Sequence, residues 1–294
     1  MTPIVSIIMP AYNAAPYIGA AITSILKQNY TDFELIIVND GSTDKTVDII
    51  KKFKDPRIIL IHNQKNYKLP KSLNKAIDAA SGKYIARSDA DDINIRNRLA
   101  VQTKYLEEHQ EIDVVGSGMY LFNDEGQIIG SLLNKKISHA DLVKNIHWFA
   151  PPLPHPTIMA KASWLRKYRY NEKYFRAEDG DLFLRSYRYS RFAYIPEMLY
   201  AYRDPGKPIM RKLSHSNYQA TLIRLQNWRE YGIPIRRVII YPLIALGRIY
   251  YHFIVKLLHR SQMWGHSKPL NITDKFIADQ EWIRECLQIK NKEN

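Results

Sequence analysis

The stretch Tyr84-Ile-Ala-Arg-Ser-Asp-Ala-Asp-Asp92 passes directly from an apolar segment into three carboxylates. The apolar residues predict a short buried strand over residues 84–88, with the acids at its carboxyl end. Three acids within four residues repel one another, and a fold tolerates them most readily when a cation lies among them. Mg²⁺ and Mn²⁺ prefer such oxygen ligands, often one or two carboxylates together with substrate phosphates. The alternative interpretation is an acidic turn with helix-capping side chains.

The segments before this stretch alternate between strands and helices. Short apolar runs predict buried strands at residues 5–9 (stopped by Pro10), 35–38 and 57–61. Apolar residues at helical spacing predict helices at residues 18–26, 44–53 and 70–80. The alternation predicts a doubly wound α/β sheet. Ligands bind beyond the carboxyl ends of the strands in such sheets, so we expect a site lined by residues 10–13, 39–42 and 89–92.

Two common nucleotide-binding motifs are absent from the sequence. No G-x-G-x-x-G follows the first predicted strand, and no G-x-x-x-x-G-K-[ST] occurs anywhere. A Rossmann dinucleotide site or a P-loop is therefore not expected. A nucleotidyltransferase is an alternative with a related α/β layout. It should carry a glycine-rich signature with a basic residue after the first strand, and Pro10-Ala-Tyr-Asn13 has neither.

Several motifs occur together in an order that resembles a known family. They are Val5–Asn13, Ile36–Asp44, Ala79–Asp92 and the pair Glu178-Asp179. The set is similar to the family 2 inverting glycosyltransferases of the GT-A fold, such as those of bacterial O-antigen and capsule synthesis. The resemblance implies an α/β fold with a Rossmann-like, doubly wound mixed sheet and a C-terminal helical extension.

The resemblance also implies a division of the chain. Residues 1–205 would form the GT-A catalytic domain, with a nucleotide-sugar-binding half over 1–95 and an acceptor-binding half over 96–205. Residues 206–294 would form a basic helical region that associates with a membrane.

The family's donor-binding residues can be placed on this sequence. Asp40 would hydrogen-bond the uracil base, and Asp89 would lie near the ribose and diphosphate. Asp91, with Asp89, would bind the Mn²⁺ or Mg²⁺ that bridges the diphosphate. The remaining donor-binding residues implied by the resemblance are Pro10, Ala11, Tyr12, Asn13, Arg87 and Ala90. For Arg87, a structural salt bridge is an equal alternative.

The family also places a catalytic acidic pair before a helix, and Ala177-Glu-Asp-Gly-Asp181 matches that pattern. The resemblance implies that Asp179 is the base that takes the acceptor proton, with Glu178 as its neighbour. A helix N-cap is the alternative role for Asp179. His155 would face the acceptor or diphosphate, and a structural histidine is its alternative role. Asp92 would support binding of the donor or the metal, or would contact the acceptor.

The resemblance implies transfer of one hexose, from UDP-glucose or UDP-galactose, to a glycan acceptor. The expected acceptor is GlcNAc-diphospho-undecaprenol, in a β-1,3 linkage. The Q-x-x-R-W signature of processive synthases is missing, since Gln226-Asn-Trp228 does not supply it. Lys68 and Arg96 depart from the family, at positions where glycine and proline are frequent.

The charge of the chain is concentrated in its second half. The 294 residues include 43 Lys and Arg and 29 Asp and Glu, a net charge of +14. Residues 161–294 carry +13 of this excess. A basic surface of this kind suits a lipid-linked phosphate, a membrane face or nucleic acid. A nucleic-acid-binding protein is therefore a second alternative, although no known binding motif is present and nucleic acid is not the expected partner.

Residues 236–260 are mostly apolar, but Arg248, His252, Lys256 and Arg260 recur every four residues. This pattern favours a helix lying in a membrane interface over one that spans the bilayer. The alternative is a helix packed on the domain with a solvated basic face. One cysteine and an N-terminus without signal-peptide features indicate a reducing compartment. The predicted location is the cytoplasm, peripherally at the cytoplasmic face of the inner membrane.

Overall fold

The structure is a computed structural model that describes residues 2–134, 137–147, 151–204, 210–257 and 273–288. Its strands are β1 (Val5–Ala11), β2 (Phe33–Asn39), β3 (Ile58–His62), β4 (Tyr84–Arg87), β5 (Ile93–Asn94), β6 (Val114–Phe122), β7 (Ile128–Leu132), β8 (Met159–Lys161) and β9 (Phe192–Arg203). Its α-helices are α1 (Ile18–Leu26), α2 (Thr46–Lys52), α3 (Leu69–Ala79), α4 (Arg98–Glu108), α5 (His139–Val143), α6 (Ala162–Tyr168), α7 (Glu178–Ser186), α8 (Met210–Asn227), α9 (Ile235–Leu257) and α10 (Asp274–Gln288).

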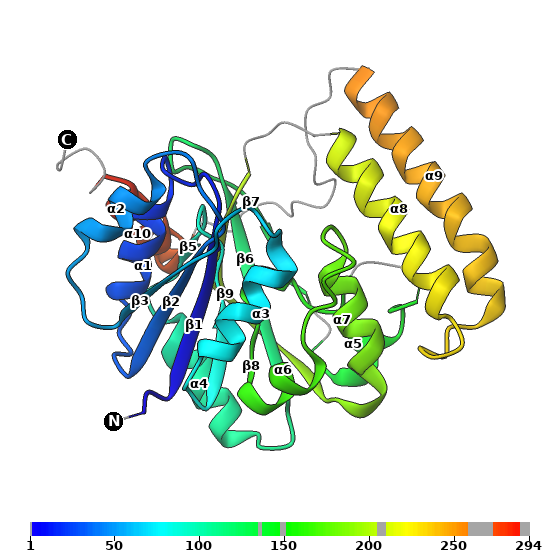
Figure 1. Ribbon diagram of the computed structural model, residues 1–294, viewed down its shortest axis with the longest axis horizontal. Helices are drawn as coiled ribbons and strands as arrows, with labels where there is room; N and C mark the ends of the chain where they lie inside the picture. Colours follow the sequence, from blue (N-terminus) through cyan, green and yellow to red (C-terminus); the bar gives the residue numbers. More distant parts are fainter. Residues whose placement is uncertain (1, 135–136, 148–150, 205–209, 258–272, 289–294) are drawn as a thin grey trace.

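One mixed sheet organises the molecule (Figure 1). The strand order is β3-β2-β1-β4-β8-β6-β9-β5, and β7 pairs with β6. The strands β3, β2, β1 and β4 are parallel, whereas β8 runs antiparallel to both of its neighbours. The predicted doubly wound mixed sheet is confirmed, and the parallel block brings the ends of β1, β2 and β4 to one edge.

Alternating side chains of the central strands bury both faces of the sheet. Ile7 and Met9 pack with α1, α2 and α4 on one face. Ile8 and Ile36 pack with α3, α6 and α7 on the other. Strands buried on both sides read as continuous apolar runs, which explains why the sequence pattern predicts them so clearly.

The first strand is longer than expected, because Pro10 does not stop it. β1 continues to Ala11, and Pro10 pairs with Val38 of β2. The backbone oxygen of Ile8 accepts a hydrogen bond from Ser88, so Pro10, two residues on, faces the same neighbour. β4 has already ended at that level, and the missing N–H of Pro10 therefore breaks no ladder hydrogen bond.

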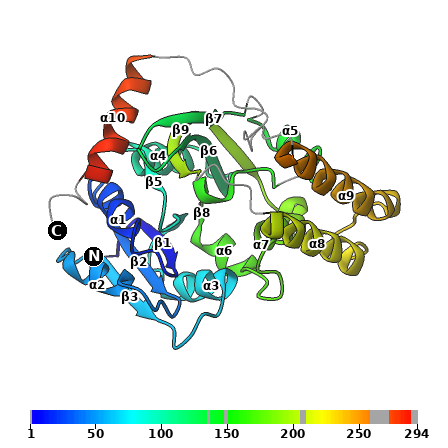
Figure 2. The same cartoon turned by 90° about the horizontal axis from the view of Figure 1, so that it is seen from above.

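The C-terminal third contains two separate structures. Helices α8 and α9 pack side by side as a hairpin beyond α7, with α9 outermost (Figures 1 and 2). Helix α10 instead returns to α1 and the β5 end of the sheet, where Trp282 and Cys286 are buried. The Trp282 indole donates to the backbone oxygen of Asn94 at 2.9 Å.

The described helices, α9 included, lack the combination of length and apolarity needed to cross a membrane. α9 nearly coincides with the helix predicted over residues 236–260. The side chains of Arg248, His252 and Lys256, and all of Arg260, lie outside the described residues.

Candidate active site

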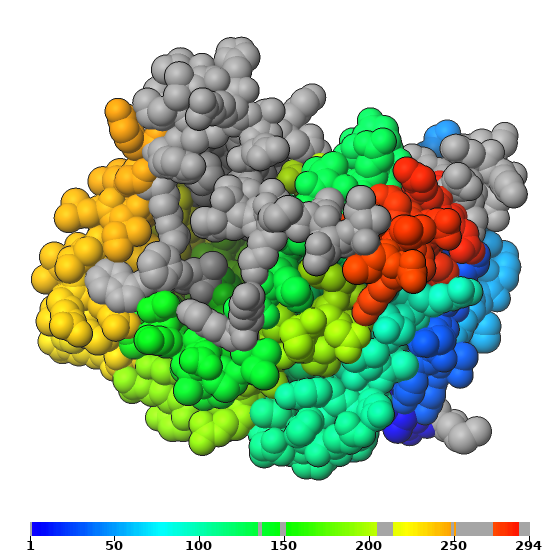
Figure 3. Space-filling view, turned by 180° about the vertical axis from the view of Figure 1, so that it is seen from behind, coloured from blue at the N-terminus to red at the C-terminus, as the bar shows by residue number. Residues whose placement is uncertain are grey.

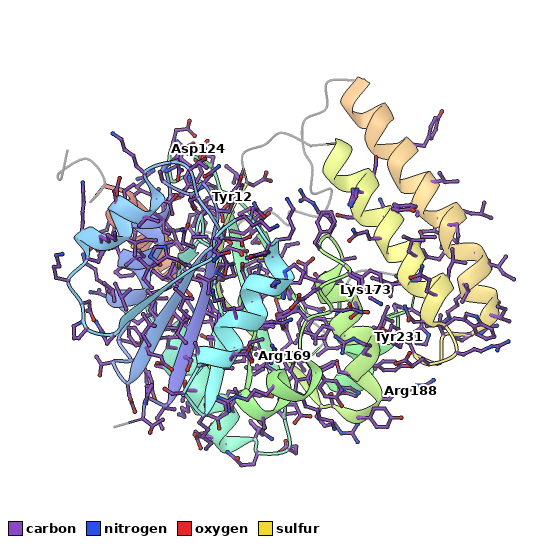
Figure 4. The ribbon with its side chains drawn as sticks, viewed as in Figure 1. Tyr12, Asp124, Arg169, Lys173, Arg188 and Tyr231 are labelled. Atoms are coloured by element: carbon purple, nitrogen blue, oxygen red, sulfur yellow. The ribbon has the colours of Figure 1, made fainter. Side chains whose placement is uncertain are left out.

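Two loops at the carboxyl edge of the sheet are tied together. The loop after β1 contains Tyr12 and Asn13, and the loop after β2 contains Ser42 and Thr43. The Asn13 N–H donates to Ser42 Oγ at 3.0 Å, and Asn13 Oδ1 accepts from the Thr43 N–H at 2.9 Å. Pro10 and Ala11 lie within β1, while Tyr12 is 49% exposed at the sheet edge (Figure 4). The loop therefore presents an exposed aromatic ring at this edge of the sheet.

Asp40 lies buried directly after β2 and organises the loop that precedes α3. Its Oδ1 accepts from Asn63 Nδ2 at 2.7 Å and from the Tyr67 N–H at 2.9 Å. Its Oδ2 accepts from the Lys68 N–H at 2.9 Å. Lys68 has φ 76° and ψ 164°, a conformation that glycine adopts far more easily than other residues. The glycine that the resemblance leads us to expect at this position would adopt this conformation without strain.

Arg87 is buried at the end of β4 and forms a two-pronged ion pair with Asp89. Its guanidinium donates to the two carboxylate oxygens at 2.9 and 2.7 Å. Ala90, next in the chain, is buried, and the Asp89 N–H donates to the Tyr200 hydroxyl. In this structure Asp89 is neutralised and oriented by Arg87, which is the salt bridge predicted as the alternative role of Arg87. The donor-binding role of Arg87 stays a prediction.

Asp91 and Asp92 differ sharply in their surroundings. Asp91 is exposed at the sheet edge; desolvation by surrounding atoms, followed by the charge of Asp89, raises its pKa to about 6. Asp92 is fully buried, and its Oδ1 accepts from the Arg203 N–H at 2.8 Å. Burial and the neighbouring acids raise the pKa of Asp92 well above its usual value. Asp92 therefore contacts β9 here rather than the open surface that an acceptor would approach.

The acids fit a divalent cation that arrives with phosphate. Among the described residues, no three His, Cys, Asp or Glu side chains converge to hold a metal. Mg²⁺ and Mn²⁺ need only one or two protein carboxylates where phosphates and water complete the shell. Asp91 offers exposed oxygens beside Asp89, and their mutual repulsion would be relieved by such an ion.

The second acidic pair begins α7. Glu178 is buried and its Oε2 has no hydrogen-bond partner. Burial and the charge of Asp179 raise the pKa of Glu178 to about 8. Asp179 is half-buried; its Oδ1 accepts from the Gly180 N–H at 2.7 Å, and desolvation raises its pKa. Both pKa values are therefore raised, which makes each carboxylate a stronger proton acceptor than a solvated one.

His155 is buried between Glu178 and Tyr170. Its Nε2 lies 2.8 Å from the Tyr170 hydroxyl, and its Nδ1 lies 4.0 Å from Glu178 Oε1. Burial, aided by the charge of Arg87, lowers the pKa of His155 well below its usual value. A neutral imidazole therefore lies beside Glu178, too far for a hydrogen bond, and adds no charge there.

The structure brings the two acidic groups together around Arg87. The Arg87 charge acts on Asp89 and Asp91 at the end of β4 and on Glu178 and Asp179 at the start of α7. Residues 178–179 are about ninety positions from residues 87–91 in the sequence. The antiparallel pairing of β8 with β4 carries the second half of the chain back to this edge.

Several residues that support the site were not predicted from the sequence. Tyr170 contacts His155, and Tyr200 binds the backbone of Asp89. Arg98 is fully buried and donates to the backbone oxygens of Arg87 and Ile158. Tyr200 lies in a buried run of β9, but no signal in a single sequence assigns its hydroxyl to Asp89.

The fold and these acids define a glycosyltransferase of the GT-A type. The chain belongs to glycosyl transferase family 2, whose family model matches residues 6–169. It is 38% identical over 211 residues to glycosyltransferase MJ1057 of Methanocaldococcus jannaschii, covering 70% of this chain and 72% of that protein. It is 33% identical to the O-antigen biosynthesis glycosyltransferase WbnJ of Escherichia coli, covering 62% and 70%.

A third relative is UDP-Glc:α-D-GlcNAc-diphosphoundecaprenol β-1,3-glucosyltransferase WfgD of Escherichia coli. It is 37% identical over 143 residues, covering 48% of this chain and 56% of WfgD. Among solved structures, S. aureus TarS 1–349 in complex with UDP shares the fold with a TM-score of 0.60 at 19% identity, covering 93% of this chain and 95% of that one. The chain spans 44% of a longer TarS structure. Mannosyltransferase PcManGT of Pyrobaculum calidifontis, solved with GDP-Man and Mn²⁺, has a TM-score of 0.58 at 16% identity, covering 99% and 87%.

Proposed function

We propose that this glycosyltransferase moves one hexose, with inversion, from UDP-glucose or UDP-galactose to a polyprenyl-diphosphate-linked GlcNAc acceptor. The product would be a β-1,3-linked disaccharide for O-antigen or another surface polysaccharide. The match to WfgD supports the substrate class, and the fold shared with the UDP complex of TarS is compatible with a UDP-sugar. The expected place of action is the cytoplasmic face of the inner membrane.

One observation carries the proposal: exposed and half-buried acids from two distant segments meet around the buried Arg87. Asp91 is exposed next to the Arg87–Asp89 pair, where a diphosphate and its cation would bind. Asp179, from the start of α7, interacts with the same Arg87 charge, and desolvation raises its pKa. A sugar held between them would have its leaving group on one side and a base on the other.

The transfer then needs one proton acceptor and one departing diphosphate. The acceptor hydroxyl oxygen attacks C1 of the sugar, and its proton passes to the Asp179 carboxylate. The bond between C1 and the diphosphate oxygen breaks, and its electron pair leaves with UDP. Attack opposite the leaving group inverts the configuration at C1. Asp89 and Asp91 would hold Mn²⁺ or Mg²⁺, which offsets charge on the leaving diphosphate.

The test is an assay of UDP release and of product structure. The full chain is incubated with UDP-glucose, UDP-galactose or UDP-GlcNAc and a synthetic GlcNAc-diphosphate-lipid, with Mn²⁺, with Mg²⁺ or with chelator. We expect a single added hexose, measured by mass, and a β-1,3 linkage, measured by NMR. Transfer from UDP-GlcNAc alone, or a product with several added sugars, would overturn the proposal.

A further inference from the structure

Helix α9 carries a stripe of large apolar side chains on its outer face. The stripe consists of Ile235, Ile239, Leu243, Leu246 and Tyr250, which are 52–67% exposed. Their spacing of three and four residues places them along one side of the helix. Of the fifteen large apolar side chains that the described residues expose, six lie on this helix. The exposure is therefore concentrated rather than scattered, as at a docking surface.

The opposite side of α9 already has a partner within the molecule. Val238, Tyr241 and Ala245 are buried, and the Arg224 guanidinium of α8 lies 3.9 Å from the centre of the Tyr241 ring. Helix α9 thus has two apolar faces. The first packs within the protein, against α8, and the second is the outer stripe. The alternative predicted from the sequence, in which this helix packs its apolar side on the domain, accounts for only one of the two faces.

The charge of the α8–α9 hairpin indicates what covers the stripe. Residues 210–257 contain eight Lys and Arg, one of which (Arg224) is buried, but a single acid, Glu230. A second copy of this chain docked stripe to stripe would place two such positive hairpins against each other. Nucleic acid would suit the charge but would leave the apolar side chains in water. An anionic lipid surface satisfies both, because acyl chains receive the stripe and headgroups attract the cations.

We propose that α9 lies in the plane of an anionic lipid bilayer, with the stripe inserted at the level of the headgroups and upper acyl chains. In the space-filling view the hairpin forms one flank of the molecule (Figure 3). The C-terminal end of α9 and Tyr12 at the sheet edge lie at the same end of the protein (Figures 1 and 4). The inference deepens the proposed function, on which it rests for its biological setting, by placing the enzyme where a polyprenyl-linked acceptor is presented.

The test compares vesicle binding of the full chain and of matched variants. Flotation is measured with phosphatidylcholine vesicles and with vesicles containing phosphatidylglycerol. We expect wild-type binding to the anionic vesicles to be at least about tenfold stronger. The double variant Leu243→Ser and Leu246→Ser should lose about tenfold or more. The double variant Ile59→Ser and Ile277→Ser changes two apolar side chains on β3 and α10 that are 39% and 48% exposed, and should bind as wild type.

Two further measurements make the outcome decisive. Circular dichroism checks that the exposed substitutions leave the fold intact, and light scattering measures the oligomeric state.

Equal vesicle binding by the stripe variant and the wild type would overturn the inference, as would loss of an oligomer in the stripe variant. Transfer to a water-soluble acceptor should be unchanged in that variant. Failure of the wild type to transfer sugar would instead count against the proposed function and leave the vesicle result standing.

Discussion

The acids at the end of β4 and the acids at the start of α7 lie in one site but have different surroundings. Asp89 is held at both oxygens by Arg87, and Asp91 is exposed. Asp92 is buried below them, with one oxygen on the Arg203 N–H and the other without a hydrogen-bond partner. Glu178 has a buried oxygen with no hydrogen-bond partner, and Asp179 is bound by a single N–H within its own turn. A held carboxylate is a fixed charge, whereas a poorly solvated one gains basicity. Asp89 and the exposed Asp91 of the first group, at β4, are thus suited to binding ions and phosphates, and the second group, at α7, is suited to accepting a proton.

The largest effect is expected when the base is removed from the second group. Asp179→Asn keeps the size of the side chain and the oxygen that accepts from the Gly180 N–H, but it removes the basic oxygen pair. We expect kcat to fall by about 10³-fold, within the range for loss of a general base. Isothermal titration should show UDP affinity within about twofold of wild type. A variant that keeps its transfer rate would show that the base is another group.

A change in the first group, the acids at the end of β4, should weaken metal binding instead of removing the base. Asp91→Ala removes an exposed carboxylate, and we expect Mn²⁺ affinity in the presence of UDP to fall by about 100-fold. Thermal stability should stay within about 0.5 kcal/mol of wild type, as for other surface substitutions. Equal Mn²⁺ affinity in variant and wild type, measured by electron paramagnetic resonance, would remove Asp91 from the metal site.

Asp92→Ala is the matched control for that experiment. It leaves the buried Arg203 N–H without its acceptor, so we expect a loss of about 1–3 kcal/mol in the free energy of unfolding. Asp91→Ala would then lower mainly Mn²⁺ affinity, whereas Asp92→Ala would lower mainly the free energy of unfolding.

The contrast also predicts a pH dependence of stability. The pKa of Glu178 is raised to about 8 in the folded state, above its value in the unfolded chain. The folded state therefore binds more protons between about pH 5 and pH 8, and its stability decreases as pH rises through this window. In Glu178→Gln this decrease should become smaller by on the order of 2 kcal/mol, measured by urea unfolding at both pH values. Glu108→Gln, an exposed acid of α4, should leave the decrease unchanged, and an equal effect of both variants would contradict the prediction.

The predictability of the two groups from sequence differs for a physical reason. Asp89 and Asp91 follow a buried strand directly, so local pattern and sheet geometry suffice to place them at the edge. Asp179 is placed by the pairing of β8 with β4, which no local pattern encodes. The Tyr170–His155 contact is missed for the same reason, since a lone tyrosine carries no sign of its partner.

The backbone of α9 was also predictable, but its orientation was not. Its apolar and basic positions predict an amphipathic helix, whereas the choice of which side packs depends on α8. The return of α10 to α1 was not expected, because all of residues 206–294 were predicted to form one basic helical region.

The smallest expected effect concerns the loop that Asp40 organises. Lys68 adopts a backbone conformation in which a side chain is strained, and its N–H donates to Asp40. Lys68→Gly should relieve this strain and raise the free energy of unfolding by about 1 kcal/mol, measured by urea denaturation. Lys65→Gly, a lysine of the same loop that is not at positive φ, should instead lower it by roughly 0.5–1 kcal/mol because glycine loses more entropy on folding. The opposite signs test whether the carboxylate of Asp40 fixes this loop against a backbone cost. Equal signs for both glycines would show that the loop rearranges freely, and that the β2 end is less rigid than the β4 end.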